Sequence, residues 1–440
     1  MKSARQYAFE ILMKIEKEGA FSNLAVDATL ANVSLSPKDK AFVSALVYGC
    51  IERKITLDYQ IERYLSKPIN KLKTAVLIVL RLGTYQLLFM DKVPVSAAVN
   101  ESVKLAKENK SEYASGLVNA VLRNICSNGL VLPDEKDEKL YFSVKYSCPE
   151  SLIGMWKKAY GQENTEELLK VSLEKPDTVL RVNTLKINED ELISLLKEEG
   201  VEAEKSNFIE NALVVQKLGC DIESLSSFKN GFFHVQDTAS QFCIKLLAPE
   251  KGERILDLCS APGGKSFTAA QYMENEGNIL AFDIYPSRTE LIDKSAERLG
   301  IENLSTCVCD ATKHYDKIEK ADRVLCDVPC SGLGVIRRKP EIKYKPLDDF
   351  KSLPDIQYKI LCNGASYVKK GGRLVYSTCT LNKKENDKIC DLFLSEHPEF
   401  KCLRPLELPS VTEKYYTFTP HLNGCDGFFA AVFERIEDDI

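Results

Sequence analysis

Apolar residues recur at helical spacing along the first 130 residues of the chain. Tyr7, Ile11 and Ile15 fall on one face of the first segment, which is the spacing of an amphipathic helix that packs against a core. Pro37 stands near the start of another periodic segment, a position that helices favour for proline. Further helices are expected over 21–31, 37–64, 71–90, 95–108 and 113–127. No strand pattern interrupts them, so residues 1–130 are predicted to form an all-α domain.

The pattern becomes mixed after a polar run at 133–139 (PDEKDEK), which is typical of a linker or an exposed turn. Helical spacing continues in 148–161 and 163–174, whereas alternating apolar residues predict short strands. These strands are expected at 178–185, 212–216 and 232–236. Residues 140–235 are therefore predicted to form a small α+β module.

Strands and helices alternate from residue 236 to the end of the chain. The strands are expected at 254–258, 278–283, 305–310, 323–327, 373–377 and 427–433, with helices that begin near Lys265, Ser287, Leu353 and Lys384. This alternation is typical of a doubly wound parallel sheet with helices on both faces. The fold class is thus α/β, with a Rossmann-like domain in residues 236–440.

Composition is consistent with a soluble globular protein of two or three domains. The chain has 440 residues, 44% of them hydrophobic and 28% charged. Its 15 cysteines are an odd number without a compact framework, so a secreted disulfide scaffold is disfavoured and a reduced, cytoplasmic setting is expected. The first 19 residues lack the apolar centre of a signal peptide. Residues 74–90 carry Arg81 in their middle, so we expect a buried helix there and no membrane span.

Charge is distributed unevenly between the two parts of the chain. Residues 1–130 carry 18 Lys and Arg against 12 Asp and Glu, whereas the remainder carries 41 against 52. A basic segment on an acidic protein suggests a contact with a polyanion there. A chance asymmetry on a solvated helical surface is the alternative.

The first strand of this α/β domain runs into a glycine-rich turn, RILDLCSAPGGKS, at 254–266. Glycine lets the backbone approach a ligand, and the following helix offers free N–H groups. Asp283 ends the second strand 20 residues after Gly263, where an acidic residue binds ribose hydroxyls in such folds. Asp310 ends the third expected strand and is a candidate for an adenine contact. The turn matches neither GxxxxGK[ST] nor GxGxxG, which disfavours ATP, GTP and NAD and favours another adenosyl cofactor.

Two cysteines follow later strands of the same sheet. Cys330 and Asp327 lie where the fourth strand ends, and Cys379 lies where the fifth ends. The carboxyl ends of parallel strands meet at one edge, where ligands bind, so these thiols are expected to act together, with one as a nucleophile. A zinc site is the other option, but CxxC pairs are missing and the four histidines lack ligand spacing. We therefore expect no metal.

A basic run follows the Cys330 turn directly. It contains Arg337, Arg338 and Lys339 and continues with Lys343, Tyr344 and Lys345. Cations beside an aromatic residue suit contacts with phosphates and stacking on a base. We expect this run to contact nucleic acid, and an exposed charged loop is the alternative.

These motifs carry a resemblance to a known family. DLCSAPGGKS, DVPCSGLGVIRRKPEIKY, YSTCTLNKKEN and GCDGFFAAVFER resemble the AdoMet-dependent RNA cytosine-5 methyltransferases. DKAFVSALVYGCIERK, LRLGTYQLLFMDKVPVSAAVNESVKLAK and GLVNAVLRNI resemble the RNA-binding domain of the NusB antitermination factor. Joined in this order, the two resemble the RsmB (Sun) type of bacterial 16S rRNA methyltransferase, whose usual target is cytosine 967 in standard rRNA numbering.

The resemblance implies a role for each matching residue. Cys379 would be the nucleophile that adds to C6 of cytosine, Cys330 the cysteine needed for product release, and Asp327 the acid near N3. S-adenosyl-L-methionine would be the cofactor, held by the glycine-rich turn and by acidic strand ends. Its expected ligands are Cys259, Ser260, Ala261, Pro262, Gly263, Gly264, Lys265, Asp283, Arg288, Asp310 and Asp327.

The resemblance also implies the reaction and the partner. The expected reaction is methyl transfer to C5 of a cytosine in 16S rRNA through a covalent Cys–C6 adduct, by a monomer acting on unassembled or partly assembled small-subunit RNA. A tRNA cytosine-5 methyltransferase shares the catalytic motifs. A non-catalytic, antitermination-like RNA-binding factor is a further alternative, which the intact glycine-rich turn and the paired cysteines oppose.

Overall fold

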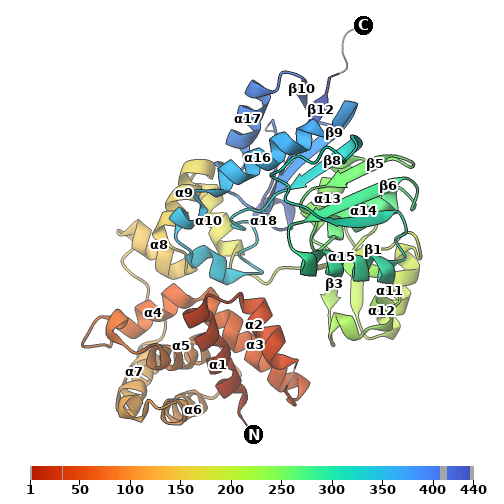
Figure 1. Cartoon of the computed structure of the whole chain (residues 1–440). Helices are drawn as coiled ribbons and strands as arrows, with labels where there is room; N and C mark the ends of the chain where they lie inside the picture. The colour runs from red at the N-terminus through yellow and green to blue at the C-terminus, as the bar shows by residue number, and fades with distance from the viewer. Residues whose placement is uncertain (1, 32, 407–413, 437–440) are drawn as a thin grey trace. The chain divides into compact units, whose positions relative to one another are not determined.

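A computed structural model describes residues 2–31, 33–406 and 414–436 of the chain (Figure 1). The described residues form two compact units. Unit 1 comprises residues 1–174 together with a short segment, 336–347, from the second half of the chain. Unit 2 comprises residues 175–335 and 348–440. The expected module at 140–235 is divided between them, since its predicted helices at 148–161 and 163–174 lie in unit 1 and its predicted strands lie in unit 2. Its boundaries stay a proposal.

Unit 1 is all-α, as the periodicity predicted. Its helices are α1 (Ala4–Glu18), α2 (Ser22–Leu30), α3 (Pro37–Glu52), α4 (Lys54–Glu62), α5 (Thr74–Phe89), α6 (Val95–Glu108), α7 (Ser115–Asn128), α8 (Glu138–Tyr146), α9 (Glu150–Tyr160) and α10 (Gln162–Val171). α1 is capped at both ends: Ser3 accepts a hydrogen bond from the Gln6 backbone, and Gly19 closes the helix in the left-handed conformation. α8 overlaps the polar run at 133–139 that was predicted to be a linker or an exposed turn. Its cap, Asp137, and its first two residues are polar like the rest of that run, so the start of the helix was not recognised.

The buried helix α5 contains the one charge that argued against a membrane span. The Arg81 guanidinium donates to both carboxylate oxygens of Asp58 at 2.7 Å and to Glu16 at 2.8 Å. These ion pairs compensate the loss of hydration of a buried charge. Among the described residues, none of the helices has the length and apolarity to cross a bilayer.

The expected helix 37–64 is two helices, and the reason lies far away in the sequence. α3 ends at Glu52, and the backbone carbonyl of Glu52 accepts hydrogen bonds from Lys343 Nζ at 2.8 Å and from the Tyr344 hydroxyl at 3.0 Å. Both donors belong to the 3₁₀ turn η4 (Pro340–Tyr344) of the inserted segment. Ser147 Oγ accepts the Ile55 backbone N–H at 2.9 Å on the other side of the break. Side chains that are distant in the sequence thus form hydrogen bonds with backbone groups that have no partner within the helix at its ends.

Unit 2 begins with a small antiparallel sheet in the order β2-β3-β1-β4. Its elements are β1 (Thr178–Val182), α11 (Glu189–Glu198), β2 (Glu202–Lys205), β3 (Ala212–Lys217), α12 (Ser226–Lys229) and β4 (Phe233–Val235). Leu180, Phe233 and Leu213 from the strands and Leu192 and Leu196 from α11 form its core. The sequence analysis missed α11 and β2, which are short and highly charged.

The large sheet of unit 2 has the order β10-β12-β9-β8-β5-β6-β7, and β11 pairs with β12. β5 to β9 are mutually parallel, whereas β12 runs antiparallel to β9. The strands are β5 (Arg254–Asp257), β6 (Asn278–Asp283), β7 (Leu304–Val308), β8 (Ala321–Asp327), β9 (Val368–Thr378), β10 (Phe400–Leu403), β11 (Tyr416–Phe418) and β12 (Phe428–Arg435). This is the predicted doubly wound, Rossmann-like sheet, with an antiparallel edge that the sequence analysis did not specify.

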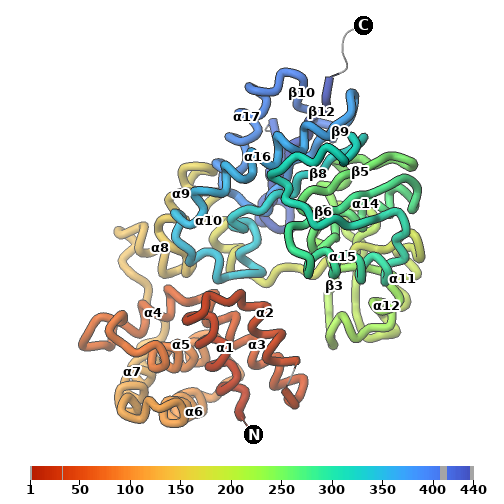
Figure 2. Tube along the Cα trace, in the orientation of Figure 1, coloured from red at the N-terminus to blue at the C-terminus, as the bar shows by residue number. Residues whose placement is uncertain are grey.

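Helices cover both faces of this sheet (Figures 1 and 2). Neighbouring strand residues alternate between two cores: Ile255 packs with α13, α14 and α15, and Leu256 packs with α16 and α17. Alternation on every strand is what a sheet buried on both faces requires. The covering helices are α13 (Thr238–Leu247), α14 (Gly264–Tyr272), α15 (Pro286–Leu299), α16 (Leu353–Ser366) and α17 (Asp387–Glu396), and a short helix, α18 (Pro420–Asn423), precedes β12.

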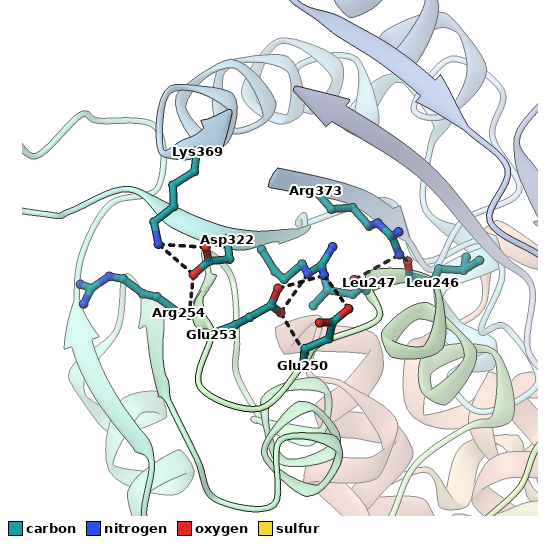
Figure 3. A network of polar contacts seen from close by, with 9 residues as sticks. Leu246, Leu247, Glu250, Glu253, Arg254, Asp322, Lys369 and Arg373 are labelled. Atoms are coloured by element: carbon teal, nitrogen blue, oxygen red, sulfur yellow. Dashed lines mark hydrogen bonds and ion pairs between the residues drawn. The ribbon is translucent and has the colours of Figure 1, made fainter. Parts of the chain in front are cut away.

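Charged groups join the amino ends of β5, β8 and β9 (Figure 3). The Asp322 carboxylate accepts a hydrogen bond from the Arg254 backbone N–H at 2.9 Å and forms an ion pair with Lys369 at 2.9 Å. Arg373 donates to the Leu246 carbonyl at the end of α13 at 2.9 Å. Because these contacts hold the edge of the sheet opposite to the carboxyl ends of the strands, they leave the carboxyl edge open for chemistry.

Candidate active site

The strand order reverses direction between β5 and β8. From β5 the chain continues through β6 and β7 on one side, and β8 and β9 are added on the other. The carboxyl ends of β5, β6, β8 and β9 place Asp257, Asp283, Asp327 and Thr378 at one edge of the sheet. Such a reversal leaves a crevice at the carboxyl edge, which is where open α/β sheets bind their ligands.

The glycine-rich turn lies at this reversal, between β5 and α14. The Leu258 backbone N–H donates to Leu325 of β8 at 3.0 Å, and the Ser260 N–H donates to Phe282 of β6 at 2.8 Å. Gly263 has φ +101°, and a Cβ there would lie 2.3 Å from the Phe267 ring. Glycine is therefore required for this turn, which brings the amino end of α14 to the crevice.

A buried carboxylate lies beneath the turn. Ser266 Oγ donates to Asp257 Oδ2 at 2.6 Å and lies 2.9 Å from Ser260 Oγ. Burial raises the pKa of Asp257 to about 6. Asp257 Oδ1 is buried and has no hydrogen-bond partner, so this site retains one unsatisfied acceptor.

The second acidic strand end lies beside exposed apolar side chains. Asp283 is buried, accepts the Tyr285 backbone N–H at 3.0 Å and has Arg288 Nη1 3.7 Å from its Oδ2. Ile284 and Val308 are each about half exposed, at 53% and 51%, and Val308 pairs with Asp283 in the β6–β7 register. An acidic group next to an open apolar surface fits a ribose followed by a flat aromatic base. The sequence analysis missed Ile284 and Val308, whose signal was their position at the ends of the strands.

Asp310 does not end the third strand, which is a correction to the predicted strand 305–310. β7 ends at Val308, and Asp310 opens a turn in which it accepts hydrogen bonds from Thr312 Oγ1 at 2.7 Å and from the Thr312 N–H at 3.0 Å. These two hydrogen bonds lower the pKa of Asp310. Lys313 Nζ lies 3.4 Å from its other oxygen.

Asp327 at the end of β8 is tied to the glycine-rich turn and to the next strand. Lys265 Nζ donates to Asp327 Oδ2 at 2.7 Å, and Ser377 Oγ of β9 donates to Oδ1 at 2.7 Å. Burial alone would lower the pKa of Lys265, but the attraction of Asp327 outweighs it and holds that pKa above its usual range. The structure thus joins two of the predicted site residues in a direct ion pair.

The two predicted cysteines are in contact. Cys330 Sγ lies 3.1 Å from Cys379 Sγ, and both are free thiols. The hydrogen bond with Cys379, followed by burial, raises the pKa of Cys330 well above its ordinary value. Two sulfur atoms on neighbouring loops can therefore take part in one reaction on a bound base.

The backbone around these sulfur atoms is closely packed. The Gly334 N–H donates to the Cys379 carbonyl at 3.0 Å, and the Gly427 N–H donates to the Gly334 carbonyl at 2.9 Å. A Cβ on Gly334 would lie 1.9 Å from the Gly427 oxygen. Gly334 and Gly427 belong to the SGLG and DGFF motifs, which carried the resemblance to the methyltransferase family, but their close contact was not predicted.

The expected nucleic-acid role of the basic run at 337–345 is wrong for two of its residues. Lys343 is buried, and Tyr344 is hydrogen-bonded to the Glu52 carbonyl and to Ser147, all within unit 1. They cap a helix end rather than face solvent. Lys345 is exposed, and its ammonium lies 4.9 Å from the centre of the Phe21 ring.

The fifteen cysteines all lie in the part of the chain that the structure describes, and all are free thiols. Within residues 2–31, 33–406 and 414–436, no three His, Cys, Asp or Glu side chains are grouped so that they could hold a metal ion.

Three family models match consecutive parts of this chain. The NusB family matches residues 2–127, a ferredoxin-like domain of RsmF/B-like methyltransferases matches 148–223, and 16S rRNA methyltransferase RsmB/F matches 244–434. A solved structure described as the crystal structure of PH0851 covers 98% of this chain and 97% of its own, with 29% identity and a TM-score of 0.82. A methyltransferase homolog protein from Pyrococcus horikoshii covers 68% and 99%, with 25% identity and a TM-score of 0.61.

Curated relatives match over nearly their full lengths. The probable ribosomal RNA small subunit methyltransferase B of Bacillus subtilis is 38% identical over 438 residues, which are 97% of each chain. The corresponding probable enzyme of Synechocystis is 35% identical and covers 99% of this chain and 100% of its own. Because relatives of this name are 35% and 38% identical over nearly the whole chain, this chain, with its NusB domain, ferredoxin-like module and Rossmann-like methyltransferase sheet, belongs to the ribosomal RNA small subunit methyltransferase B family.

Proposed function

We propose that this protein transfers a methyl group from S-adenosyl-L-methionine to C5 of a cytosine in 16S rRNA, through a covalent bond between Cys379 and C6 of the base. The 3.1 Å contact between the thiols of Cys330 and Cys379 carries this proposal. The two cysteines follow β8 and β9, the neighbouring strands that carry Asp327 and its hydrogen-bond partner Ser377, which supports a shared site at this edge of the sheet. The names of the relatives support ribosomal RNA as the substrate class.

The residues at the glycine-rich turn fit the cofactor. The turn lacks side chains at Gly263 and Gly264, and the unsatisfied Asp257 Oδ1 lies beneath it. We assign residues 259–265, Asp283, Arg288, Asp310 and Asp327 to its binding, with Asp283 toward the ribose and Asp310 toward the adenine edge. When bound, the cofactor supplies an activated methyl carbon.

The two cysteines supply covalent catalysis, because C5 of cytosine is too weak a nucleophile by itself. The Cys379 thiolate forms a bond to C6, and the electron pair of the C5–C6 double bond moves toward C5 and N3. C5 can then take up the methyl group. Loss of the C5 proton to a base restores the C5–C6 double bond and breaks the Sγ–C6 bond. We propose that this step takes place next to Cys330.

Asp327 stabilises the charge that this addition creates. N3 becomes more basic as sulfur adds to C6, and a fixed carboxylate stabilises a proton there most strongly in the transition state. Lys265 and Ser377 hold the two oxygens of Asp327, so it needs little reorganisation. The target base has to leave its stack to reach the sulfur atoms, which costs on the order of a few kcal/mol.

Two substitutions test these roles. Cys379→Ala is expected to abolish methyl transfer to 16S rRNA transcripts, since the nucleophile is lost. Cys330→Ala is expected to accumulate a covalent RNA–protein adduct, visible on a denaturing gel. Methylation by Cys379→Ala, together with no adduct from Cys330→Ala, would contradict the assignment.

Substrate and setting are tested by the same assay. Transfer to tRNA transcripts in preference to 16S rRNA would favour the tRNA alternative, and no binding of the cofactor in calorimetry would favour a non-catalytic RNA-binding factor. We propose that the protein acts as a monomer in the cytoplasm on unassembled or partly assembled small-subunit RNA, and the free state of its fifteen cysteines suits a reducing compartment. Bisulfite sequencing of rRNA from a deletion strain identifies the target cytosine.

A further inference from the structure

A buried carboxylate binds the residue that follows Cys330 and takes no part in the proposed chemistry. Glu385 precedes α17, and its side chain is fully buried. Its carboxylate accepts hydrogen bonds from the Ser331 backbone N–H at 2.9 Å and from Ser331 Oγ at 2.6 Å. Gln357 Nε2 donates at 3.0 Å and Asn382 Nδ2 at 2.8 Å. With four donors around two oxygens, the group is built to be an ionised acceptor.

These contacts join the loops that carry the two cysteines. Ser331 follows Cys330 in the chain, and its hydroxyl also lies 2.7 Å from Thr380 Oγ1, which follows Cys379. Gln357 Nε2 also donates to the Pro329 carbonyl at 2.9 Å. The carboxylate thus fixes the residue after Cys330 and reaches, through one hydroxyl, the residue after Cys379.

The negative charge also acts on one of the sulfur atoms. The pKa of Cys330 is raised by its hydrogen bond with Cys379, by burial and by the charges of Cys379 and Glu385. These two residues are the titratable groups that face Cys330 most directly. A fixed charge in a buried environment is screened little, so it disfavours a second thiolate beside it.

We propose that Glu385 is the positioning residue that holds the Cys330 loop against the Cys379 loop and keeps Cys330 a thiol while Cys379 is the nucleophile. This inference rests on the proposed function. In the release step a base takes the C5 proton, the C5–H electron pair re-forms the C5–C6 double bond, and the Sγ–C6 bond breaks with its electron pair staying on Cys379. The Cys330 S–H then donates a hydrogen bond to the departing sulfur, which a Cys330 thiolate could not do.

Glu385→Gln tests the proposal, because it keeps the size of the side chain but removes the charge and turns an acceptor into a donor facing other donors. We expect release of methylated RNA to slow by about tenfold or more, with adduct accumulating on denaturing gels, as for loss of a buried charged hydrogen bond. Release in the natural protein is expected to fall as pH rises through the pKa of Cys330. Without the charge this fall should move to lower pH, because a nearby negative charge disfavours the thiolate. The Michaelis constant for the cofactor should be unchanged.

The matched control is Glu199→Gln. Glu199 accepts the backbone N–H groups of Ser226 and Ser227 and the hydroxyl of Ser227, which is the same kind of contact in the small sheet module. It should leave adduct levels and the pH profile unchanged. Glu385→Asp keeps the charge but moves it one methylene further from Cys330. It should shift the pH profile of release in the same direction by a smaller amount. It replaces Glu385→Gln if that variant fails to fold.

The outcomes separate the two proposals. A rate loss in Glu385→Gln or Glu385→Asp without adduct and without a shift of the pH profile would overturn the role of Glu385, even if Cys330→Ala still forms an adduct. Absence of adduct from Cys330→Ala, with methylation by Cys379→Ala, would instead overturn the proposed function.

Discussion

Lys343 shows how a single residue can be misjudged from its chemistry alone. It lies in a run of cations, yet its side chain is 3% exposed and its ammonium donates to the Glu52 carbonyl at the end of α3. Burial lowers the pKa of Lys343 from 10.5 to about 8. Its charge therefore costs stability in the folded state, although its hydrogen bond caps a helix.

This cost predicts a pH dependence. Between pH 8 and 10.5 the unfolded chain binds more protons at Lys343 than the folded one, so stability rises with pH. Lys343→Met removes the titrating group. The difference between the ordinary pKa of 10.5 and the pKa of about 8 in the folded protein corresponds to ~3 kcal/mol. The unfolding free energy of the natural protein, relative to the variant, should increase by about that amount from pH 7 to pH 10.5 in denaturant titrations.

Lys345→Met is the control, because Lys345 is exposed and lies two residues away. The difference in unfolding free energy between Lys345→Met and the natural protein should not change with pH over the same range. A flat difference for Lys343→Met would show that Lys343 is hydrated in solution.

At the scale of elements, the site depends on how closely three loops approach one another. The loop after β8, the loop after β9 and the turn before β12 meet at Gly334, the Cys379 carbonyl and Gly427. Each element was recognisable from its own pattern, but a contact in which a Cβ would lie 1.9 Å from a backbone oxygen depends on all three. The spacing of the two sulfur atoms is set by this packing and by Glu385.

Gly334→Ala is accordingly expected to damage the site. The added methyl group meets backbone atoms that cannot rotate away, so we expect a loss of about 1–3 kcal/mol of stability and a large fall in methylation rate. Thermal unfolding and methyl transfer measure the two effects. Gly154→Ala in α9 is the matched control, since a Cβ there meets nothing within 4 Å. It should be stabilising by about 0.5–1 kcal/mol with unchanged activity.

At the scale of the whole molecule, charge separates the two parts of the chain. The net positive charge of residues 1–130 includes exposed Lys67, Lys71 and Lys73, which lie between α4 and α5. The ammonium of Lys73 lies 5.0 Å from the centre of the Tyr113 ring, and that side chain is 65% exposed. Lysines beside an exposed aromatic residue suit a flexible polyanion that carries bases.

Reversing these charges should weaken RNA binding in a salt-dependent way. For Lys67→Glu, Lys71→Glu and Lys73→Glu combined, we expect the slope of log affinity against log salt to fall by about 2, at roughly 0.7 per lost phosphate contact. Filter binding of an rRNA fragment at several salt concentrations measures it. The same reversal at the exposed residues Lys197, Lys229 and Lys251 of unit 2 should change the slope less. Equal effects would show that total charge, not this surface, governs binding.

Hydrophobic periodicity was sufficient to predict an all-α domain, a mixed module and a doubly wound sheet, because side-chain spacing reports which face of an element is buried. Because the carboxyl ends of parallel strands lie at one edge of a sheet, the sequence also predicted that Asp327, Cys330 and Cys379 lie close together. The Lys265–Asp327 pair, the contact of the two thiols, Glu385 behind them and the capping of α3 by Lys343 emerged only from the folded chain. Each joins residues that are dozens to hundreds of positions apart, and local spacing carries no information about the path of the loops that bring such residues into contact.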